Sequence, residues 1–296
     1  MKTGLAINID AGLLRELPLV RADGDADKEV RGRVEIVGGS TSAPGAIRLC
    51  GLAALRAGAG KIQLAVPESI ATALGIALME AGVVGLPQSD SGELQGTSPE
   101  LRAVVEQAGA VLIGPGMMNE DAAQEVARFL LSEVIGPVFV VDAMALTGLG
   151  DSTELLQRHE GRVVITPHAG EMAALSGRSK EDVATNAEEI ASEIAVRLGC
   201  IVVLKGSCTY IAQPDGTTHA HSLENAGLAT AGSGDVLAGT IAGLAAQGNP
   251  ALRACIWGVF AHAQAGVQLR SRIGPLGFLA SELLAEIPSL LAAPDK

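Results

Sequence analysis

The chain has 296 residues, of which 48% are hydrophobic and only 2% aromatic, and it carries a formal net charge of −12. These values argue against nucleic acid and anionic membrane surfaces as partners, since both attract basic proteins and single strands also need rings for stacking. No run of about 18 apolar residues occurs. Residues 1–17 lack a basic segment followed by a sustained apolar run. We therefore expect a soluble, cytoplasmic protein.

Composition also bounds the fold and its covalent links. No linker or internal repeat divides the chain, so we predict one domain over residues 1–296, although this length allows about two average domains. The 37 glycines and the high apolar content are typical of a sheet buried on both faces and joined to helices by tight turns. The cysteines form no Cys-x-x-Cys pair, so we expect neither disulfides nor zinc. They are Cys50, Cys200, Cys208 and Cys255.

Hydrophobic periodicity predicts alternating strands and helices after a charged surface loop over 21–31. Predicted strands cover 34–37, 61–66, 110–113, 138–141, 163–166, 201–204 and 209–212. Predicted helices cover 44–59, 69–79, 120–134, 180–198, 251–269 and 276–284. This alternation indicates a mostly parallel sheet with helices on both faces. The turn Pro214-Asp215-Gly216 predicts a hairpin, which would make the later sheet edge antiparallel.

The stretch from Asn225 to Gly248 is the strongest functional signal. Its first half is glycine-rich, and its second half has the apolar spacing of a buried helix. Free amides at a helix N-terminus bind anions, and glycines let a phosphate approach the backbone closely. Asp235, in the first turn, is a candidate base for phosphoryl transfer. An ordinary helix cap would use the same residue types, so Gly-Ser-Gly-Asp alone does not decide between these alternatives.

Other polar residues follow the predicted strands. Each has an ordinary interpretation: Asp142 could cap a turn, His168 could be a loop histidine, and Lys205 could be a surface cation. Parallel sheets bind ligands at the carboxyl ends of their strands, so together these residues favour a phosphate-handling crevice. Neither a Gly-x-x-x-x-Gly-Lys-Ser/Thr sequence nor a Gly-x-Gly-x-x-Gly sequence after a strand occurs, which disfavours a P-loop enzyme and a dinucleotide-binding fingerprint.

A series of short blocks also follows in order along the chain. They are Gly39-Ser40 with Pro44-Gly45-Ala46, Gly114-Pro115-Gly116, Val141-Asp142-Ala143, Thr166-Pro167-His168 with Gly170-Glu171, Leu204-Lys205-Gly206 and Gly232-Ser233-Gly234-Asp235. From about residue 28 onward the chain resembles the NAD(P)H-hydrate dehydratases, the carbohydrate-kinase-type half of bifunctional NAD(P)H-hydrate repair enzymes. The resemblance implies a ribokinase-like three-layer α/β sandwich. It also implies an enzyme that uses ADP, or ATP, with Mg²⁺ to turn hydrated NADH or NADPH back into the reduced cofactor.

The resemblance assigns roles to particular positions. It implies that Asp235 removes a proton from the added ring hydroxyl, whose oxygen attacks the terminal phosphate of ADP before phosphate is eliminated. The loop glycines Gly232 and Gly234 would stabilise the transferring group through backbone amides. It assigns no metal ligands. The implied substrate contacts are Ala46, Gly116, His168 and Asp235, and the implied nucleotide contacts are Lys205, Gly206, Ser207, Cys208, Thr209 and Gly234.

The chain departs from the family pattern at a few points. Ala231 stands where a second glycine is usual, at a cost of about 1 kcal/mol if the backbone there is left-handed. Glu29 replaces a small residue, and the epimerase half is lacking, so a separate epimerase would be the functional partner. The family commonly forms homotetramers. The alternatives are an ATP-dependent small-molecule kinase of the same superfamily and a nucleotide-binding regulatory protein in which Asp235 is only a cap.

Overall fold

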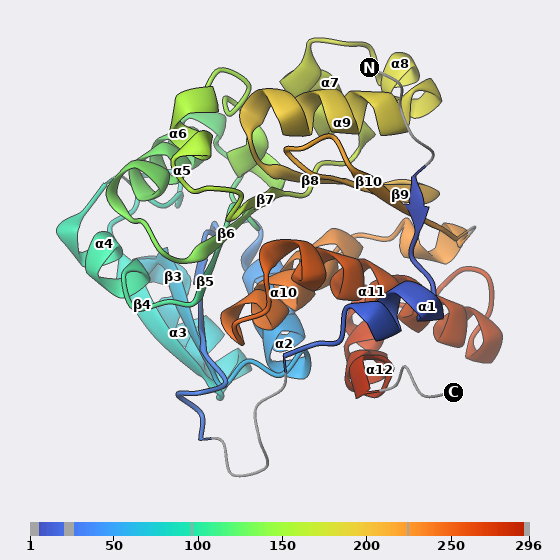
Figure 1. Cartoon of the computed structure of the whole chain (residues 1–296). Coiled ribbons are helices and arrows are strands. Elements are labelled where there is room, and N and C mark those ends of the chain that lie inside the picture. Colours follow the sequence, from blue (N-terminus) through green and yellow to red (C-terminus); the bar gives the residue numbers. More distant parts are fainter. Residues whose placement is uncertain (1–5, 21–26, 96, 224, 293–296) are drawn as a thin grey trace.

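One ten-stranded sheet runs through the part of the chain that the computed structural model describes, which is residues 6–20, 27–95, 97–223 and 225–292 (Figure 1). The strands are β1 Ile7–Asn8, β2 Arg33–Val37, β3 Lys61–Pro67, β4 Ala81–Leu86, β5 Ala110–Ile113, β6 Val138–Val141, β7 Val163–Ile165, β8 Ile201–Leu204, β9 Cys208–Ala212 and β10 Thr218–Ser222. Their order is β1-β10-β9-β8-β7-β6-β5-β2-β3-β4. Only β9 is antiparallel to its neighbours, so the predicted hairpin and antiparallel region are confirmed.

Helices cover both faces of this sheet, as the sequence predicts (Figure 1). They are α1 Ala11–Glu16, α2 Pro44–Arg56, α3 Glu68–Ala77, α4 Pro99–Val105, α5 Glu120–Glu133, α6 Thr153–Gln157, α7 Ala169–Ser176, α8 Lys180–Thr185, α9 Ala187–Leu198, α10 Ser233–Ala246, α11 Ala251–Arg272 and α12 Ala280–Ala292. Two short 3₁₀ helices are η1 Ala143–Leu146 and η2 Ala226–Leu228. Among the described residues, no helix combines the length and apolarity needed to cross a membrane.

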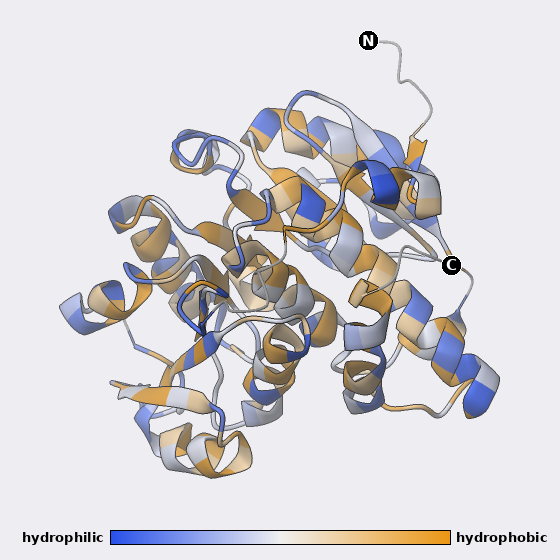
Figure 2. Cartoon of the chain, turned by 60° about the horizontal axis from the view of Figure 1, so that its bottom comes forward, coloured by the Kyte–Doolittle hydropathy of each residue, from blue (hydrophilic) through white to orange (hydrophobic). Residues whose placement is uncertain are grey.

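Alternating strand residues divide the core into two layers. In β5, Ala110 and Leu112 pack beneath α2, α10, α11 and α12, whereas Val111 and Ile113 pack beneath α4 to α9. This period of two is the pattern that a strand buried on both faces requires. In Figure 2 the strands are largely hydrophobic, while hydrophilic segments lie mainly on outer helices and loops.

Helix α10 lies deep in this core because its glycines allow close packing against α2. A Cβ atom at Gly239 would lie 2.4 Å from the Cys50 carbonyl oxygen, and one at Gly243 would lie 2.6 Å from the Ala54 carbonyl oxygen. Both distances are too short for a side chain. The small residues of the second half of the 225–248 stretch therefore hold α10, and with it Asp235, at a defined depth in the protein.

Several predicted boundaries were wrong. The single helix expected over 180–198 is two helices, since Asn186 leaves helical geometry at φ −119° and ψ 38° and becomes the N-cap of α9. The last helix begins at Ala280 rather than 276 and continues past Pro288. The short elements β1, β4, α1, α4, α6 and α7 were not predicted, because few residues carry their periodicity. Residues 21–26 of the expected charged loop lie outside the described residues.

Candidate active site

Three neighbouring strand ends bring an acid, a hydroxyl and a cation together. Asp142 follows β6, Thr166 follows β7 and Lys205 follows β8. The Lys205 Nζ atom lies 2.8 Å from Asp142 Oδ1, and Thr166 Oγ1 donates to the same oxygen at 2.7 Å. Asp142 is only 2% exposed and makes no side-chain capping bond to η1. The interpretation of Asp142 as a turn cap is therefore wrong.

Lys205 is also not a free surface cation, because 80% of its side-chain surface is covered. A second carboxylate, that of Glu171, lies 4.0 Å from its Nζ atom. Burial opposes the charge of Lys205, but Asp142, Glu171 and Asp235 together raise its pKa above the usual value. Its ammonium group faces α10, since a Cβ atom at Gly234 would lie 3.3 Å from Nζ. The positive charge is thus held at the start of that helix.

The N-terminus of α10 has unpaired amides beside this cation. Gly232 is the N-cap in left-handed geometry, with φ 88°, and has no side chain to cap the helix. Among the described residues, the amides of Gly234 and Asp235 have no hydrogen-bond partner. Two amides at a helix N-terminus next to a lysine form an anion site that suits a phosphate. The possible strain at Ala231 does not arise, because the left-handed residue is Gly232.

Asp235 lies in the first turn of α10, as predicted. Burial, reinforced by the nearby Asp142 carboxylate, raises the pKa of Asp235 to about 7, although Lys205 acts in the opposite direction. A carboxyl group with a pKa near the working pH is suited to accept a proton during catalysis. Burial, and not a hydrogen bond that caps α10, is therefore the main cause of the raised pKa of Asp235.

His168 is the N-cap of α7, so its ordinary structural interpretation is correct in part. Its Nδ1 atom accepts hydrogen bonds from the amides of Gly170 at 3.0 Å and Glu171 at 3.1 Å, and the Glu171 carboxylate accepts from the His168 amide at 2.7 Å. Because Nδ1 is an acceptor, a neutral ring carries its proton on Nε2. The side chain is 60% exposed, and its Nε2 atom lies 3.6 Å from Glu171 Oε1, beyond hydrogen-bond distance, so the Nε2–H group can still donate to a ligand.

A pocket of about 930 Å³ opens beside the start of α10 and reaches along α11. Its polar end includes six of the residues predicted to bind substrate or nucleotide, and its other walls are apolar. The predicted residues are His168, Lys205, Gly206, Ser207, Thr209 and Gly234, and the apolar ones include Leu228, Leu237, Val259 and Ala263. A pocket with a charged end and an apolar end matches a nucleotide, because the phosphates are charged and the faces of the base are apolar.

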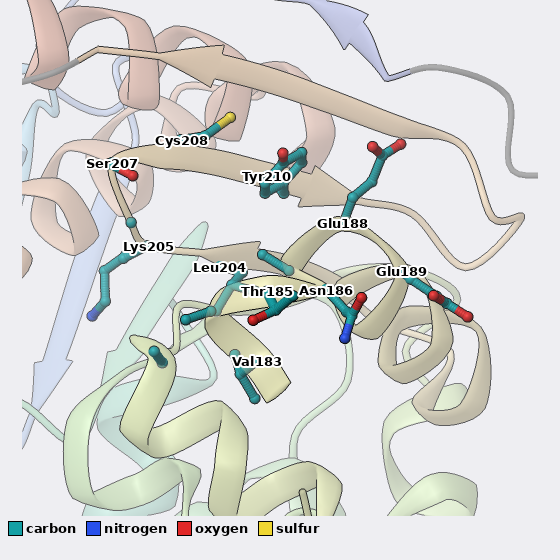
Figure 3. Close-up of a pocket in the computed structure, with 14 residues that line it drawn as sticks. Val183, Thr185, Asn186, Glu188, Glu189, Leu204, Lys205, Ser207, Cys208 and Tyr210 are labelled. Carbon is teal, nitrogen blue, oxygen red and sulfur yellow. The ribbon is translucent and has the colours of Figure 1, made fainter. Parts of the chain in front are cut away.

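Five predicted residues do not line this pocket, and they are Ala46, Gly116, Cys208, Gly232 and Asp235. Cys208 lines a second pocket of about 550 Å³ with Tyr210 and Glu188, and this pocket shares Lys205, Gly206 and Ser207 with the larger one (Figure 3). Lys205 extends away from Glu188 in that view. Ala46 and Gly116 are neighbours, because a Cβ atom at Gly116 would lie 3.3 Å from the Ala46 Cβ atom, but they line neither pocket.

Sequence reasoning missed His262 of α11, which supports the start of α10. Its Nε2 atom lies 3.0 Å from the Ser233 carbonyl oxygen and 2.9 Å from Ser233 Oγ. Burial lowers the pKa of His262 to about 4, so the ring is neutral at pH 7. No sequence signal identified it, since the two residues are 29 positions apart and His262 occurs within an otherwise ordinary helix.

The mostly parallel sheet with helices on both faces places the chain in the ribokinase-like class, and the glycine-capped helix, the lysine and the partly buried acid form its candidate site for phosphoryl transfer. A solved ribokinase-like superfamily protein from Enterococcus faecalis has the same fold. Its chain is 27% identical with a TM-score of 0.79, and the match covers 97% of this chain and 95% of that one.

The chain belongs to the NAD(P)H-hydrate dehydratase family, whose model matches residues 34–289. It is 44% identical, over 96% of its length and 95% of the relative's, to the ADP-dependent (S)-NAD(P)H-hydrate dehydratase of Xanthomonas campestris. It is 26% identical to the Bacillus subtilis ADP/ATP-dependent NAD(P)H-hydrate dehydratase co-crystallised with ATP/Mg²⁺, with a TM-score of 0.79 and coverage of 97% and 98%. Bifunctional repair enzymes are also relatives, and the chain spans about half of their length, for example 52% of one of them.

Proposed function

We propose that this protein is a lyase that dehydrates hydrated NADH or NADPH to the reduced cofactor while converting ADP to AMP and phosphate. The observation that carries the proposal is the position of Asp235, a buried acid with a pKa of about 7 beside two unpaired helix amides and Lys205. The membership of the family and the name of the Xanthomonas campestris relative support ADP as the phosphoryl donor.

In the proposed reaction the carboxylate of Asp235 removes the proton of the added ring hydroxyl. The hydroxyl oxygen bonds to the terminal phosphorus of ADP, and the bond from that phosphorus to the bridging oxygen breaks, which releases AMP. The carbon–oxygen bond to the new phosphate then breaks, and loss of the neighbouring ring proton restores the double bond. The amides of Gly234 and Asp235 would stabilise the charge on the transferring group.

The proposed binding residues form two groups, one for the nucleotide and one for the hydrated dinucleotide. Lys205, Gly206, Ser207, Thr209 and Gly234 line the large pocket, which supports their role in holding the nucleotide. The exposed Nε2–H group of His168 would donate to the hydrated dinucleotide. The proposed contacts of Ala46 and Gly116 with the substrate, and of Cys208 with the nucleotide, rest on the family resemblance alone.

Magnesium fits this site in its usual protein form, with one or two carboxylates, several waters and the phosphates of the substrate. Among the described residues, no group of three or more His, Cys, Asp or Glu side chains is arranged to hold a metal ion by itself. Asp142 and Glu171 flank Lys205 and would hold Mg²⁺ through its water ligands. When bound, the ion would neutralise part of the phosphate charge.

The deciding experiment supplies hydrated NADH or NADPH with ADP or ATP and follows the return of reduced-nicotinamide absorbance. We expect absorbance to return with ADP, together with equimolar AMP and phosphate, and Asp235→Asn to remove the signal. ATP consumption with a small-molecule acceptor and no return of absorbance would support a kinase instead. Binding of nucleotide without any turnover would support a regulatory protein.

We also propose that the enzyme is cytoplasmic, works as a homotetramer and depends on a separate epimerase to interconvert the two hydrate epimers. The dehydratase shares one chain with a second activity in the bifunctional relatives, which supports a functional link of this kind. Light scattering after size exclusion checks the assembly. Adding a purified epimerase to an equal mixture of the two hydrate epimers should double the amount of cofactor that the protein restores.

A further inference from the structure

A buried imidazole in the large pocket has one nitrogen without a partner. His221 lies near the end of β10 and is 9% exposed. Its Nδ1 atom is 3.0 Å from the carbonyl oxygen of Ile9, which follows the neighbouring strand β1. A carbonyl oxygen can only accept a hydrogen bond, so Nδ1 carries the ring proton and Nε2 is a bare acceptor. The N-terminal segment therefore determines the tautomer of this pocket residue.

The Nε2 atom of His221 is buried and has no hydrogen-bond partner among the residues that the structure describes, although His221 lines the pocket. An unsatisfied buried acceptor costs free energy, so a ligand that supplies a donor would gain from binding there. Asn225 Nδ2 is also unpartnered and also lines the pocket. However, the other end of that amide already caps η2 through the Gly227 amide, which explains the presence of Asn225 structurally.

The surroundings of His221 indicate which donor arrives. Its cross-strand neighbour Thr209 lines the same pocket, and the ring meets Phe260 of α11 edge-on with a centroid distance of 5.9 Å. Val259 and Ala263 of α11 supply apolar walls beside it. A nucleotide whose phosphates lie at the start of α10 would place its flat base along these walls, close to His221.

We propose that His221 Nε2 accepts a hydrogen bond from the exocyclic amine of an adenine base and so selects ADP over 6-oxopurine nucleotides. The inference rests on the proposed function and names a specificity residue for it. A hypoxanthine base has an oxygen in place of the amine, and two acceptors facing each other repel. Burial lowers the pKa of His221, which keeps the ring neutral and prevents it from becoming a donor to that oxygen.

The test compares ADP with inosine diphosphate as phosphoryl donors for hydrated NADH. Wild-type protein should show a kcat/KM about tenfold higher with ADP, the discrimination worth about 1.4 kcal/mol. His221→Phe should remove most of this preference, because it lowers the ADP value and relieves the repulsion of inosine diphosphate. His221→Gln, which restores an acceptor oxygen, should keep part of it. The matched control is His219→Phe on the same strand, because His219 also has an unpartnered buried nitrogen but does not line the pocket.

Different outcomes separate the inference from the proposed function. Equal use of the two donors by wild-type protein, or equal losses with both donors in His221→Phe, would overturn the role of His221 while the dehydratase stands. A preference for ADP that survives in His221→Phe would also overturn it, because another group would then recognise the exocyclic amine. Failure of wild-type protein with every donor would overturn the function itself. Melting curves followed by the fluorescence of Trp257 check that each variant is folded.

Discussion

Glu35, which is buried, and Asp235, which is partly buried, are carboxyl groups with the same chemistry and different surroundings. Glu35 lies in the middle of β2 and Asp235 at the start of α10. Burial raises the pKa of Glu35 to about 8 and that of Asp235 to about 7, and each has one basic residue acting against the shift. Glu35 is 0% exposed, and within the described part of the chain neither of its carboxyl oxygens has a hydrogen-bond partner. The difference lies in what else surrounds each acid.

Asp235 adjoins unpaired amides and the Lys205 ammonium group and follows Gly234, which lines the large pocket, whereas Glu35 faces its strand neighbours Gln63 and Val111 within the sheet. Burial alone disfavours the ionised form of a carboxyl group, and burial is the dominant effect at Glu35. An acid becomes useful when it can also reach a substrate and when its charged form has a nearby cation. The comparison predicts that substitutions at the two positions act on different measurable quantities.

The largest effect is expected at Asp235. Asp235→Asn should lower kcat about 100- to 10,000-fold, because the amide keeps the size of the side chain but cannot accept the proton. Nucleotide affinity and the far-ultraviolet circular dichroism spectrum should change little. In wild-type protein, kcat/KM should fall about tenfold for each pH unit below about 7, because protonation removes the base. Near-normal turnover by the variant would exclude Asp235 as the base.

Glu35 should affect stability rather than turnover. The pKa of its carboxyl is 4.5 as an ordinary glutamate and about 8 in the folded chain, so between these values the folded state holds a proton that the unfolded state releases. The free energy of unfolding should therefore decrease as the pH rises from 4.5 to 8, by about 4–5 kcal/mol in total. Glu35→Gln should remove this slope in urea titrations at several pH values. Glu80→Gln, at an exposed position, is the control and should leave the slope in place.

Lys205→Ala tests how much the neighbouring cation contributes to nucleotide binding and to the pKa of Asp235. The affinity for ADP and AMP should weaken by about 1.5–3 kcal/mol, the value of a charge-assisted hydrogen bond. Loss of the charge should also move the acid limb of the kcat/KM profile to higher pH, since Lys205 lowers the pKa of Asp235. Isothermal titration and pH–rate profiles measure the two effects. Lys61→Ala, which removes the exposed ion pair with Glu29, should change neither.

The smallest effect is expected at His168, where a cap and a ligand contact share one ring. His168→Ala should raise the apparent binding constant for the hydrate about tenfold, or about 1.4 kcal/mol, with little change for the nucleotide. It should also lower stability by about 1 kcal/mol through loss of the cap on α7. His168→Asn restores a capping oxygen, so it should recover the melting temperature but not hydrate affinity. Recovery of both would make His168 purely structural.

The sequence alone was sufficient for much of the architecture and for one part of the site. Alternating periodicity predicted the mostly parallel sheet with helices on both faces, and the small-residue run before Asp235 predicted the helix start at which the anion site is proposed. These signals are local, because a strand period, a helix period and a glycine-rich turn are each contained in a few consecutive residues. The elements without such signals, including β1 and α7, were found only in the structure.

Tertiary structure decided how the candidate residues combine. Asp142 and Lys205 are 63 positions apart, and their contact depends on β7 lying between β6 and β8 in the sheet. The tautomer of His221 depends on the Ile9 carbonyl group, 212 positions away. The pKa values of Glu35 and Asp235 depend on burial, which no residue determines by itself. The sequence specifies the local conformation and the chemistry of each side chain. The charge state and the hydrogen-bond partners of a side chain depend on distant segments that meet only in the folded chain.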